Sequence, residues 1–167
     1  RIGLDIGMKV DHTALVMVEE ETGKNVLRFM FKYKLGASFQ YVTNTVKDFY
    51  NSVKEKGDVY SFTVDATGIG SAPAQMIQQA IPDIRVDNFI FTNKTKRELV
   101  GHIKALHSMG KLKFATKKGD EVYNRTLTEL INEMRQIQMK VFRNEGDNPE
   151  IEIFRTGAHK QILKIRR

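Results

Sequence analysis

Hydrophobic and polar positions along the first third of the chain predict strands followed by a helix. Three strand-like segments rich in β-branched and aromatic residues come first, at residues 1–6, 13–19 and 26–33. A polar turn at residues 21–24 joins the last two, and such short connections predict an antiparallel meander. Hydrophobic residues then recur every three or four positions from Phe39 to Val53, which predicts an amphipathic helix with Ser38 as its N-cap and an end at Gly57.

The remainder of the chain alternates between strand-like and helix-like patterns. Short hydrophobic runs predict strands at residues 59–65, 84–91 and 111–114. Helical spacing predicts a helix at residues 71–80, a second that ends at Met109 before Gly110, and a third at residues 122–137. Residues 139–143 and 151–154 flank a polar, glycine- and proline-containing segment, which predicts a hairpin. The last residues resemble the start of a helix.

This order of elements predicts an α/β fold of the ribonuclease H-like type, with a mixed sheet flanked by helices. That fold has a three-strand antiparallel meander, then a helix, then strand, helix and strand. A right-handed crossover would place the strand at residues 59–65 parallel to the first strand and beside it. Because neighbouring strands lie about 5 Å apart, Asp5 and Asp65 at the ends of these two strands could share a metal ion.

The two aspartates are the residues with the clearest chemical signal. Each ends a short hydrophobic run and is followed within three residues by a glycine, Gly7 or Gly68, which allows the backbone to turn sharply. A buried carboxylate is costly unless a cation or hydrogen-bond donors compensate it, and Mg²⁺ prefers one or two such carboxylates. The simpler alternative is that each aspartate caps a turn. Two aspartates in matching contexts favour the metal site.

Composition restricts the class of protein. The chain has 167 residues, 41% hydrophobic and 28% charged, as in a single folded domain. The sequence shows no hydrophobic run long enough to cross a bilayer, so no membrane partner is expected. A net charge of +7 favours a polyanionic partner. The absence of cysteine excludes disulfides, thiolate zinc sites and a cysteine nucleophile.

Several motifs together resemble the nuclease domain of the large terminase subunit of tailed bacteriophages and related viruses. The resemblance covers nearly the whole chain, and its specificity comes from the order and spacing of individually loose motifs. These are Gly3-Leu4-Asp5-Ile6-Gly7, Asp11-His12-Thr13-Ala14, Val64-Asp65-Ala66-Thr67-Gly68-Ile69-Gly70, Asn93-Lys94-Thr95-Lys96-Arg97-Glu98, Gly110-Lys111-Leu112 and Gly157-Ala158-His159.

The resemblance implies a metal-dependent endonuclease that cleaves double-stranded DNA during genome packaging. In such an enzyme Asp5 and Asp65 would be catalytic and would hold Mg²⁺ or Mn²⁺, with two ions expected. The resemblance further implies an ATPase domain N-terminal to residues 1–167, and we expect this chain, which starts at Arg1 and enters a strand at once, to be an excised domain. Other implied partners are the portal and the small terminase subunit, in the cytoplasm of the host cell.

One position departs from the family pattern. Family members carry a third acid just after a Gly-x-His element, whereas this chain has Lys160 and Gln161 after His159. An ammonium group there would repel the metal and remove a ligand, so full catalytic competence is not assured. Either these residues replace the third acid, or another acid such as Asp11, Asp120 or Glu121 supplies it. His159 is a candidate additional metal ligand, although a single histidine in a basic tail is more often a surface residue.

Candidate DNA-binding residues lie at a predicted helix start and near the C-terminus. Lys94, Lys96 and Arg97 open a helix, where free amides and basic side chains together attract phosphate, and Lys160 adds a further positive charge. A solvated helix start explains the first three equally well. Two other classes stay open at this point: half of a sugar-kinase or actin-like ATPase, which uses a similar sheet, and a catalytically impaired DNA-binding domain of the same fold.

Overall fold

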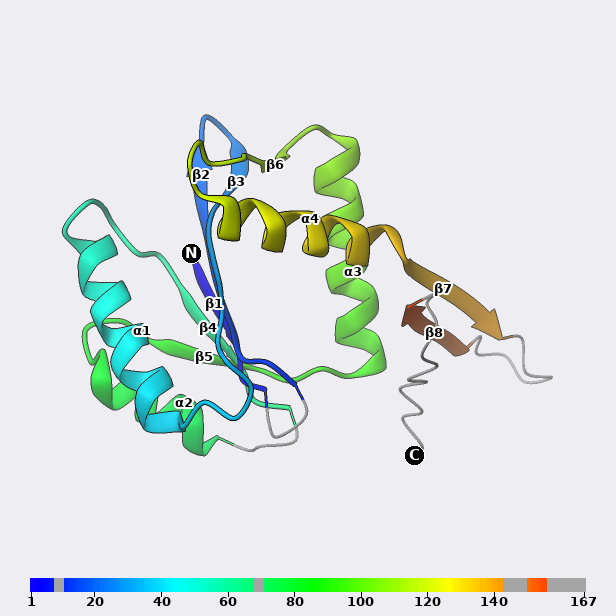
Figure 1. Cartoon of the computed structure of the whole chain (residues 1–167). Helices are drawn as coiled ribbons and strands as arrows, with labels where there is room; N and C mark the ends of the chain where they lie inside the picture. The colour runs from blue at the N-terminus through cyan, green and yellow to red at the C-terminus, as the bar shows by residue number, and fades with distance from the viewer. Residues whose placement is uncertain (8–10, 68–70, 143–149, 156–167) are drawn as a thin grey trace. The chain divides into compact units, whose positions relative to one another are not determined.

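The computed structural model describes residues 1–7, 11–67, 71–142 and 150–155 of the chain, and only the backbone for 138–142 and 150–155. The chain forms two compact units (Figure 1). The first contains residues Arg1–Phe91 and Leu106–Ala115, and the second contains Thr92–Ala105 and Thr116–Arg167. Each unit is described by itself below. Helix α3 contributes residues to both.

The first unit is built on a six-stranded mixed sheet with strand order β5-β4-β1-β2-β3-β6. Strands β1, β2 and β3 form the predicted antiparallel meander, while β4, β5 and β6 pair in parallel with β1, β4 and β3 respectively. The fold class is therefore confirmed. The strands are β1 (Ile2–Asp5), β2 (Ala14–Glu21), β3 (Lys24–Lys32), β4 (Phe62–Asp65), β5 (Val86–Phe89) and β6 (Leu112–Phe114).

The turn between β2 and β3 and the start of helix α1 follow directly from the sequence. Thr22 and Gly23 both have positive φ angles, 49° and 73°, which is the conformation that a two-residue hairpin turn with right-handed strand twist requires. Helix α1 (Phe39–Lys54) begins after Ser38, whose Oγ accepts a hydrogen bond from the Tyr41 amide at 3.2 Å. The predicted N-cap is confirmed.

Helices α1 and α2 (Ala72–Ala80) lie on one face of the sheet, as Figure 1 shows. The fully buried side chains of this core come from alternate positions of the central strands and from one side of each helix. Pro73 occupies the first turn of α2, where no intrahelical amide bond is lost. The core contains Ile2, Leu4, Leu15, Tyr33, Val42, Val46, Phe62, Val64, Ala74 and Ile77, among other residues.

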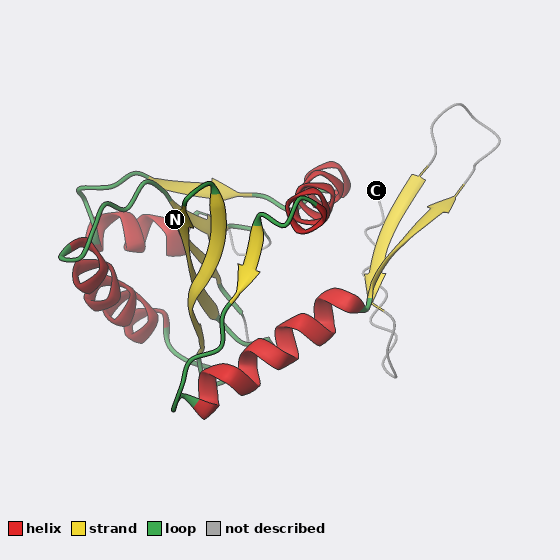
Figure 2. Ribbon diagram, turned by 90° about the horizontal axis from the view of Figure 1, so that it is seen from above, coloured by secondary structure: helices red, strands yellow, loops and turns green. Residues whose placement is uncertain are grey.

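The second unit contains most of helix α3 (Asn93–Ser108), helix α4 (Glu121–Arg135) and a two-stranded sheet. Strands β7 (Ile137–Phe142) and β8 (Glu150–Arg155) pair antiparallel, so the predicted hairpin is confirmed, and Figure 2 shows it following α4 directly. Helix α4 ends two residues before the predicted Ile137, because Ile137 already pairs with Arg155. No helix in the described part of the chain is long and hydrophobic enough to cross a membrane.

Candidate active site

Asp5 and Asp65 lie side by side at one end of the six-stranded sheet. Leu4 of β1 is in register with Val64 of the parallel strand β4, so the next residue of each strand is the aspartate. The two carboxyl groups are within hydrogen-bonding reach of each other. The crossover through α1, which makes β4 parallel to β1, thus brings together two residues that are sixty positions apart in sequence.

The surroundings of Asp5 disfavour its negative charge. Burial raises the pKa of the Asp5 carboxyl group, and the negative charges of Asp65 and Asp11 raise it further. Hydrogen bonding with Asp65 acts in the same direction. Two neighbouring carboxylates therefore act on Asp5, and a bound cation would relieve this repulsion.

Local hydrogen bonds fix the orientation of Asp65. Its Oδ1 accepts a hydrogen bond from the Thr67 amide at 2.7 Å, which leaves Oδ2 free of this bond. The Thr67 Oγ1 accepts a hydrogen bond from the Phe91 amide at 2.8 Å, and the Ala66 amide donates to the Phe89 carbonyl at 2.9 Å. These hydrogen bonds connect the residues after β4 to the end of β5 and the residues that follow it. The carboxylate of Asp65 is held in one orientation instead of swinging into solvent.

The segment that carries Asp11 is held against the end of β1. Thr13 is buried, and its Oγ1 accepts a hydrogen bond from the Gly7 amide at 3.1 Å. A Cβ atom at Gly7 would lie 2.2 Å from the Asp11 carbonyl oxygen, so only glycine fits there. His12 adds a contact between its Nδ1 and the Tyr33 carbonyl at 2.8 Å. These contacts explain how Asp11 comes close enough to influence Asp5.

Of the three sequence alternatives for a third acid, Asp11 acts electrostatically on Asp5, whereas Asp120 has another role. The carboxylate of Asp120 accepts a hydrogen bond from the Tyr123 amide at 2.9 Å and caps helix α4. Glu121 lies in the first turn of the same helix. Within the part of the chain that the structure describes, no three acidic or histidine side chains come close enough to hold one ion jointly. His159, Lys160 and Gln161 lie outside the described residues.

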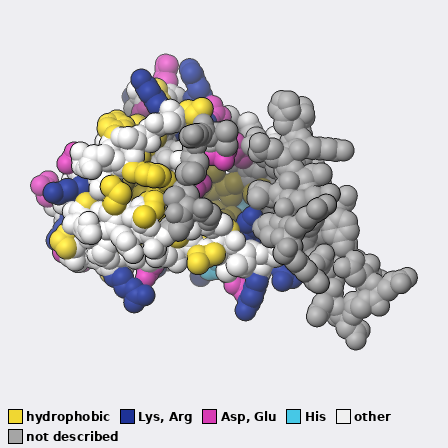
Figure 3. All heavy atoms as spheres, turned by 90° about the horizontal axis from the view of Figure 1, so that it is seen from below, with side chains coloured by type: hydrophobic (Ala, Val, Ile, Leu, Met, Phe, Trp, Pro, Cys, Tyr) yellow, Lys and Arg dark blue, Asp and Glu magenta, His cyan; other side chains and the backbone are white. Residues whose placement is uncertain are grey.

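The face of the molecule in Figure 3 shows acidic side chains beside a group of hydrophobic ones. Exposed hydrophobic residues follow the last part of β3, the connection to α1 and the start of that helix. They are Phe31, Leu35, Phe39 and Tyr41, with exposed fractions between 37% and 52%.

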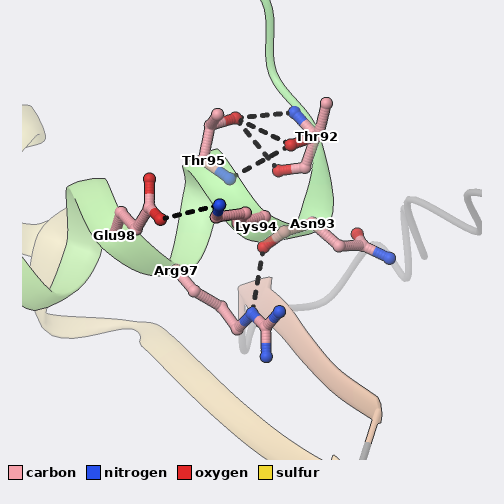
Figure 4. Close-up of polar contacts among 6 residues, drawn as sticks. All are labelled: Thr92, Asn93, Lys94, Thr95, Arg97 and Glu98. Atoms are coloured by element: carbon pink, nitrogen blue, oxygen red, sulfur yellow. Dashed lines mark hydrogen bonds and ion pairs between the residues drawn. The ribbon is translucent and has the colours of Figure 1, made fainter.

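The start of helix α3 is capped by a reciprocal pair of threonines (Figure 4). The Thr92 amide donates to Thr95 Oγ1 at 2.7 Å, and the Thr95 amide donates to Thr92 Oγ1 at 3.1 Å. The predicted DNA-binding residues follow in this first turn. The Lys94 Nζ lies 3.9 Å from Glu98 Oε1, and the Arg97 Nε donates a hydrogen bond to the Asn93 carbonyl oxygen at 3.3 Å. Their DNA binding stays a prediction.

A mixed sheet with this order and an aspartate pair at the ends of its first and fourth strands defines the ribonuclease H-like class of nuclease folds. Comparison with known proteins gives the family: residues 2–146 match the model for the terminase RNaseH-like domain, and the chain belongs to that family. The predicted resemblance to large terminase nuclease domains is confirmed, and the kinase or actin-like alternative is not favoured. The search of curated proteins gave no match.

Solved structures support the same fold at low sequence identity. The large terminase nuclease from thermophilic phage G20c has a TM-score of 0.60 and 15% identity, over 95% of this chain and 73% of that one. The human cytomegalovirus terminase nuclease domain, soaked with Mn and bound to an inhibitor, has a TM-score of 0.61 and 15% identity, over 80% and 74%. The nuclease domain of the large terminase subunit gp2 of bacterial virus Sf6 gives 0.58 and 13%, over 92% and 76%.

Proposed function

We propose that this domain is a divalent-metal-dependent endonuclease that cuts double-stranded DNA during viral genome packaging. The observation that carries the proposal is the strand register, which places Asp5 and Asp65 side by side at the ends of two parallel strands, where Asp65 raises the pKa of Asp5. Membership of the terminase RNaseH-like family supports the reaction class. The human cytomegalovirus domain soaked with Mn, and the G20c nuclease with bound cobalt, support a divalent ion.

The residues present fit a hard divalent cation. Asp5 and Asp65 supply carboxylate oxygens, and Asp11 adds a third negative charge close to Asp5. The repulsion that raises the pKa of Asp5 would be relieved by a cation shared between the two carboxylates. When bound, Mg²⁺ or Mn²⁺, with two ions expected, would generate hydroxide from water and stabilise the leaving oxygen of a phosphodiester.

The protein's own residues would position these groups. Thr67 fixes Asp65 through its amide, and the close packing of Gly7 against Asp11 fixes the approach of Asp11 to Asp5. Basic residues would bind backbone phosphates, which positions DNA without reading its sequence. Candidates from the sequence are Lys94, Lys96, Arg97 and Lys160.

The wider setting follows from the same proposal. The domain would act next to an ATPase domain in the same chain, with the portal and the small terminase subunit as further partners, in the cytoplasm of the host cell. The third acid of the family would be replaced here by Lys160, with Asp11 compensating in part.

Nicking of a supercoiled plasmid tests the proposal. The protein should nick DNA with Mn²⁺ and not with EDTA, and Asp5→Asn or Asp65→Asn should each lower the rate at least about 100-fold, because the amide keeps the shape and loses the charge. Asp83→Asn is the matched control, since Asp83 pairs with Lys54 on the surface. Activity that persists in both site variants, or is absent from the starting protein with Mn²⁺ and Mg²⁺, contradicts the proposal.

A further inference from the structure

We propose that Lys32, at the end of β3, binds a backbone phosphate of the DNA strand that lies across Asp5 and Asp65. The inference rests on the proposed nuclease function and adds a residue to it. Lys32 belongs to the same compact unit as the two acids, whereas Lys94, Lys96 and Arg97 belong to the other unit.

Strand register places Lys32 in one row with the acid pair. Asp5 is opposite Ala14 in the antiparallel pair β1–β2, and Ala14 is opposite Lys32 in the pair β2–β3. On the other side, Asp65 follows the last residue that is paired between β1 and β4. The row across four neighbouring strands is therefore Asp65, Asp5, Ala14 and Lys32.

The residues of this row share one face of the sheet. Directly opposed residues of paired strands project to the same side, and consecutive residues of a strand project to opposite sides. Leu4, Leu15 and Val64, each one position from a member of the row, belong to the core that α1 and α2 form. Asp5, Asp65 and Lys32 therefore share the face of the sheet that is directed away from α1 and α2.

The spacing suits an extended polyanion. Two strand spacings separate Lys32 from Asp5, about 10 Å. Between them stands Ala14, whose methyl group is too small to block a DNA strand that lies along the row. Lys32 is exposed, and its long side chain can extend toward a phosphate. A phosphate bound by Lys32 would be a near neighbour of the phosphodiester at the acid pair.

Several other cations of the first unit form ion pairs away from this row. Arg28 pairs with Glu19 and Glu21, both at 2.6 Å. Arg1 pairs with Glu20 at 2.8 Å, and Lys54 pairs with Asp83. Glu19, Glu20 and Glu21 lie in the half of β2 remote from Ala14. Among the described residues, strand register places Lys32 on the face and at the end of the sheet where the acids lie.

The test measures DNA affinity without cleavage. A fluorescent duplex is titrated with protein in EDTA, at several salt concentrations, and the slope of log affinity against log salt is determined. The variants are Lys32→Gln, Lys32→Arg and the control Lys56→Gln. Lys56 is exposed in the turn after α1, before β4 begins. The Lys56→Gln substitution therefore removes the same charge at the opposite end of the sheet.

Loss of one phosphate contact should weaken binding roughly eightfold at 0.1 M salt and lower the salt slope by about 0.9. Lys32→Gln should show both changes, Lys32→Arg should show neither, and Lys56→Gln should change affinity less than twofold. The same affinity loss should raise KM for plasmid nicking with kcat retained. Circular dichroism verifies that each variant is folded.

Three results would overturn the inference. If Lys32→Gln binds and nicks DNA like the starting protein, Lys32 is not a phosphate ligand, while the proposed nuclease function stands. An equal loss in Lys32→Gln and Lys56→Gln would mean that only the overall charge matters. A starting protein that neither binds nor nicks DNA would remove the proposed function together with this inference.

Discussion

The acidic residues at the two ends of the six-stranded sheet have opposite electrostatic surroundings. At the end where β2 meets the turn into β3, Arg1 pairs with Glu20 at 2.8 Å, and Arg28 pairs with both Glu19 and Glu21 at 2.6 Å. At the other end the carboxyl group of Asp5 faces that of Asp65, and the negative charge of Asp11 acts on it as well. The first arrangement neutralises charge. The second concentrates it.

The difference distinguishes ion-paired surface groups from the carboxylates that the proposed nuclease reaction would use. Exposed ion pairs such as those of Arg28 contribute little to stability, but they remove repulsion between neighbouring acids. The acid end instead keeps carboxylates together at a cost in stability, and such strained electrostatics are typical of functional sites. The cost is recovered if a divalent cation binds between Asp5 and Asp65.

Among the remaining variants, the largest loss of nicking activity is expected when the hydrogen bond between Thr67 and the Phe91 amide is removed. Thr67→Val removes the hydroxyl that accepts from the Phe91 amide and leaves that amide without this acceptor. We expect nicking to fall about tenfold, as for other residues that orient a metal ligand. Thr67→Ser keeps the hydroxyl and should keep most of the activity. Equal nicking rates in the starting protein and in Thr67→Val would show that the position of Asp65 does not depend on the hydrogen bond between Thr67 and Phe91.

Adding an acid at the predicted third position should give a smaller gain. If Lys160 stands where the family has an acid, Lys160→Asp changes the local charge by two units in favour of a cation. We expect a several-fold lower Mn²⁺ concentration at half-maximal nicking and a higher rate. Gln161→Asp is the control for register. No gain from either variant, with robust activity in the starting protein, would mean that another acid, with Asp11 the first candidate, completes the site.

Removing the charge of Asp5 should stabilise the metal-free protein. Because the pKa of Asp5 is raised in the folded state, the folded protein holds the Asp5 proton more tightly than the unfolded chain does. The free energy of unfolding therefore falls as pH rises from about 4 through that raised pKa. Asp5→Asn lacks this loss, so its melting temperature in EDTA should exceed that of the starting protein at pH 7, by on the order of 2 °C. The difference should shrink below pH 4. A lower melting temperature at pH 7 would contradict the repulsion between the carboxylates.

The ion-paired end of the sheet should respond least. Arg28→Gln removes two exposed ion pairs without touching the acid pair, so nicking should stay within twofold and melting should change only slightly. Nicking rates and thermal melts in low and moderate salt would check this. A loss of activity comparable with that of Thr67→Val would show that the ion-paired end of the sheet influences the acid pair, and would contradict the separation of the two ends.

Periodicity and capping signals in the sequence were sufficient to predict much of the fold. Ser38 and the spacing from Phe39 to Val53 predicted helix α1, and the turn at Thr22 and Gly23 predicted the β2–β3 hairpin. Strand ends were less accurate. Strand β4 begins at Phe62 instead of Val59, because β1 begins its pairing at Ile2, opposite Phe62, and gives the earlier residues no full partner strand.

For the site, local sequence was enough to find Asp5 and Asp65 but not the residues that surround them. An aspartate at the end of a hydrophobic run followed by glycine is a local signal. Lys32 carries no such signal, because its relation to Asp5 depends on the register of three strands. Thr67 is similar, since its contact with Phe91 joins two loops. Asp11, which lies shortly before β2, was already one of the sequence alternatives for the third acid, but its effect on Asp5 became evident only in the structure.

A crystal soaked with Mn²⁺ tests the central claim most directly, because the anomalous signal of the metal locates it without any assumption about activity. We predict a peak between Asp5 and Asp65, in contact with carboxylate oxygens of both, and its loss in crystals of Asp5→Asn. Mn²⁺ bound only elsewhere, or no peak at this end of the sheet at millimolar Mn²⁺, would contradict the assignment of the acid pair as the metal centre of a nuclease.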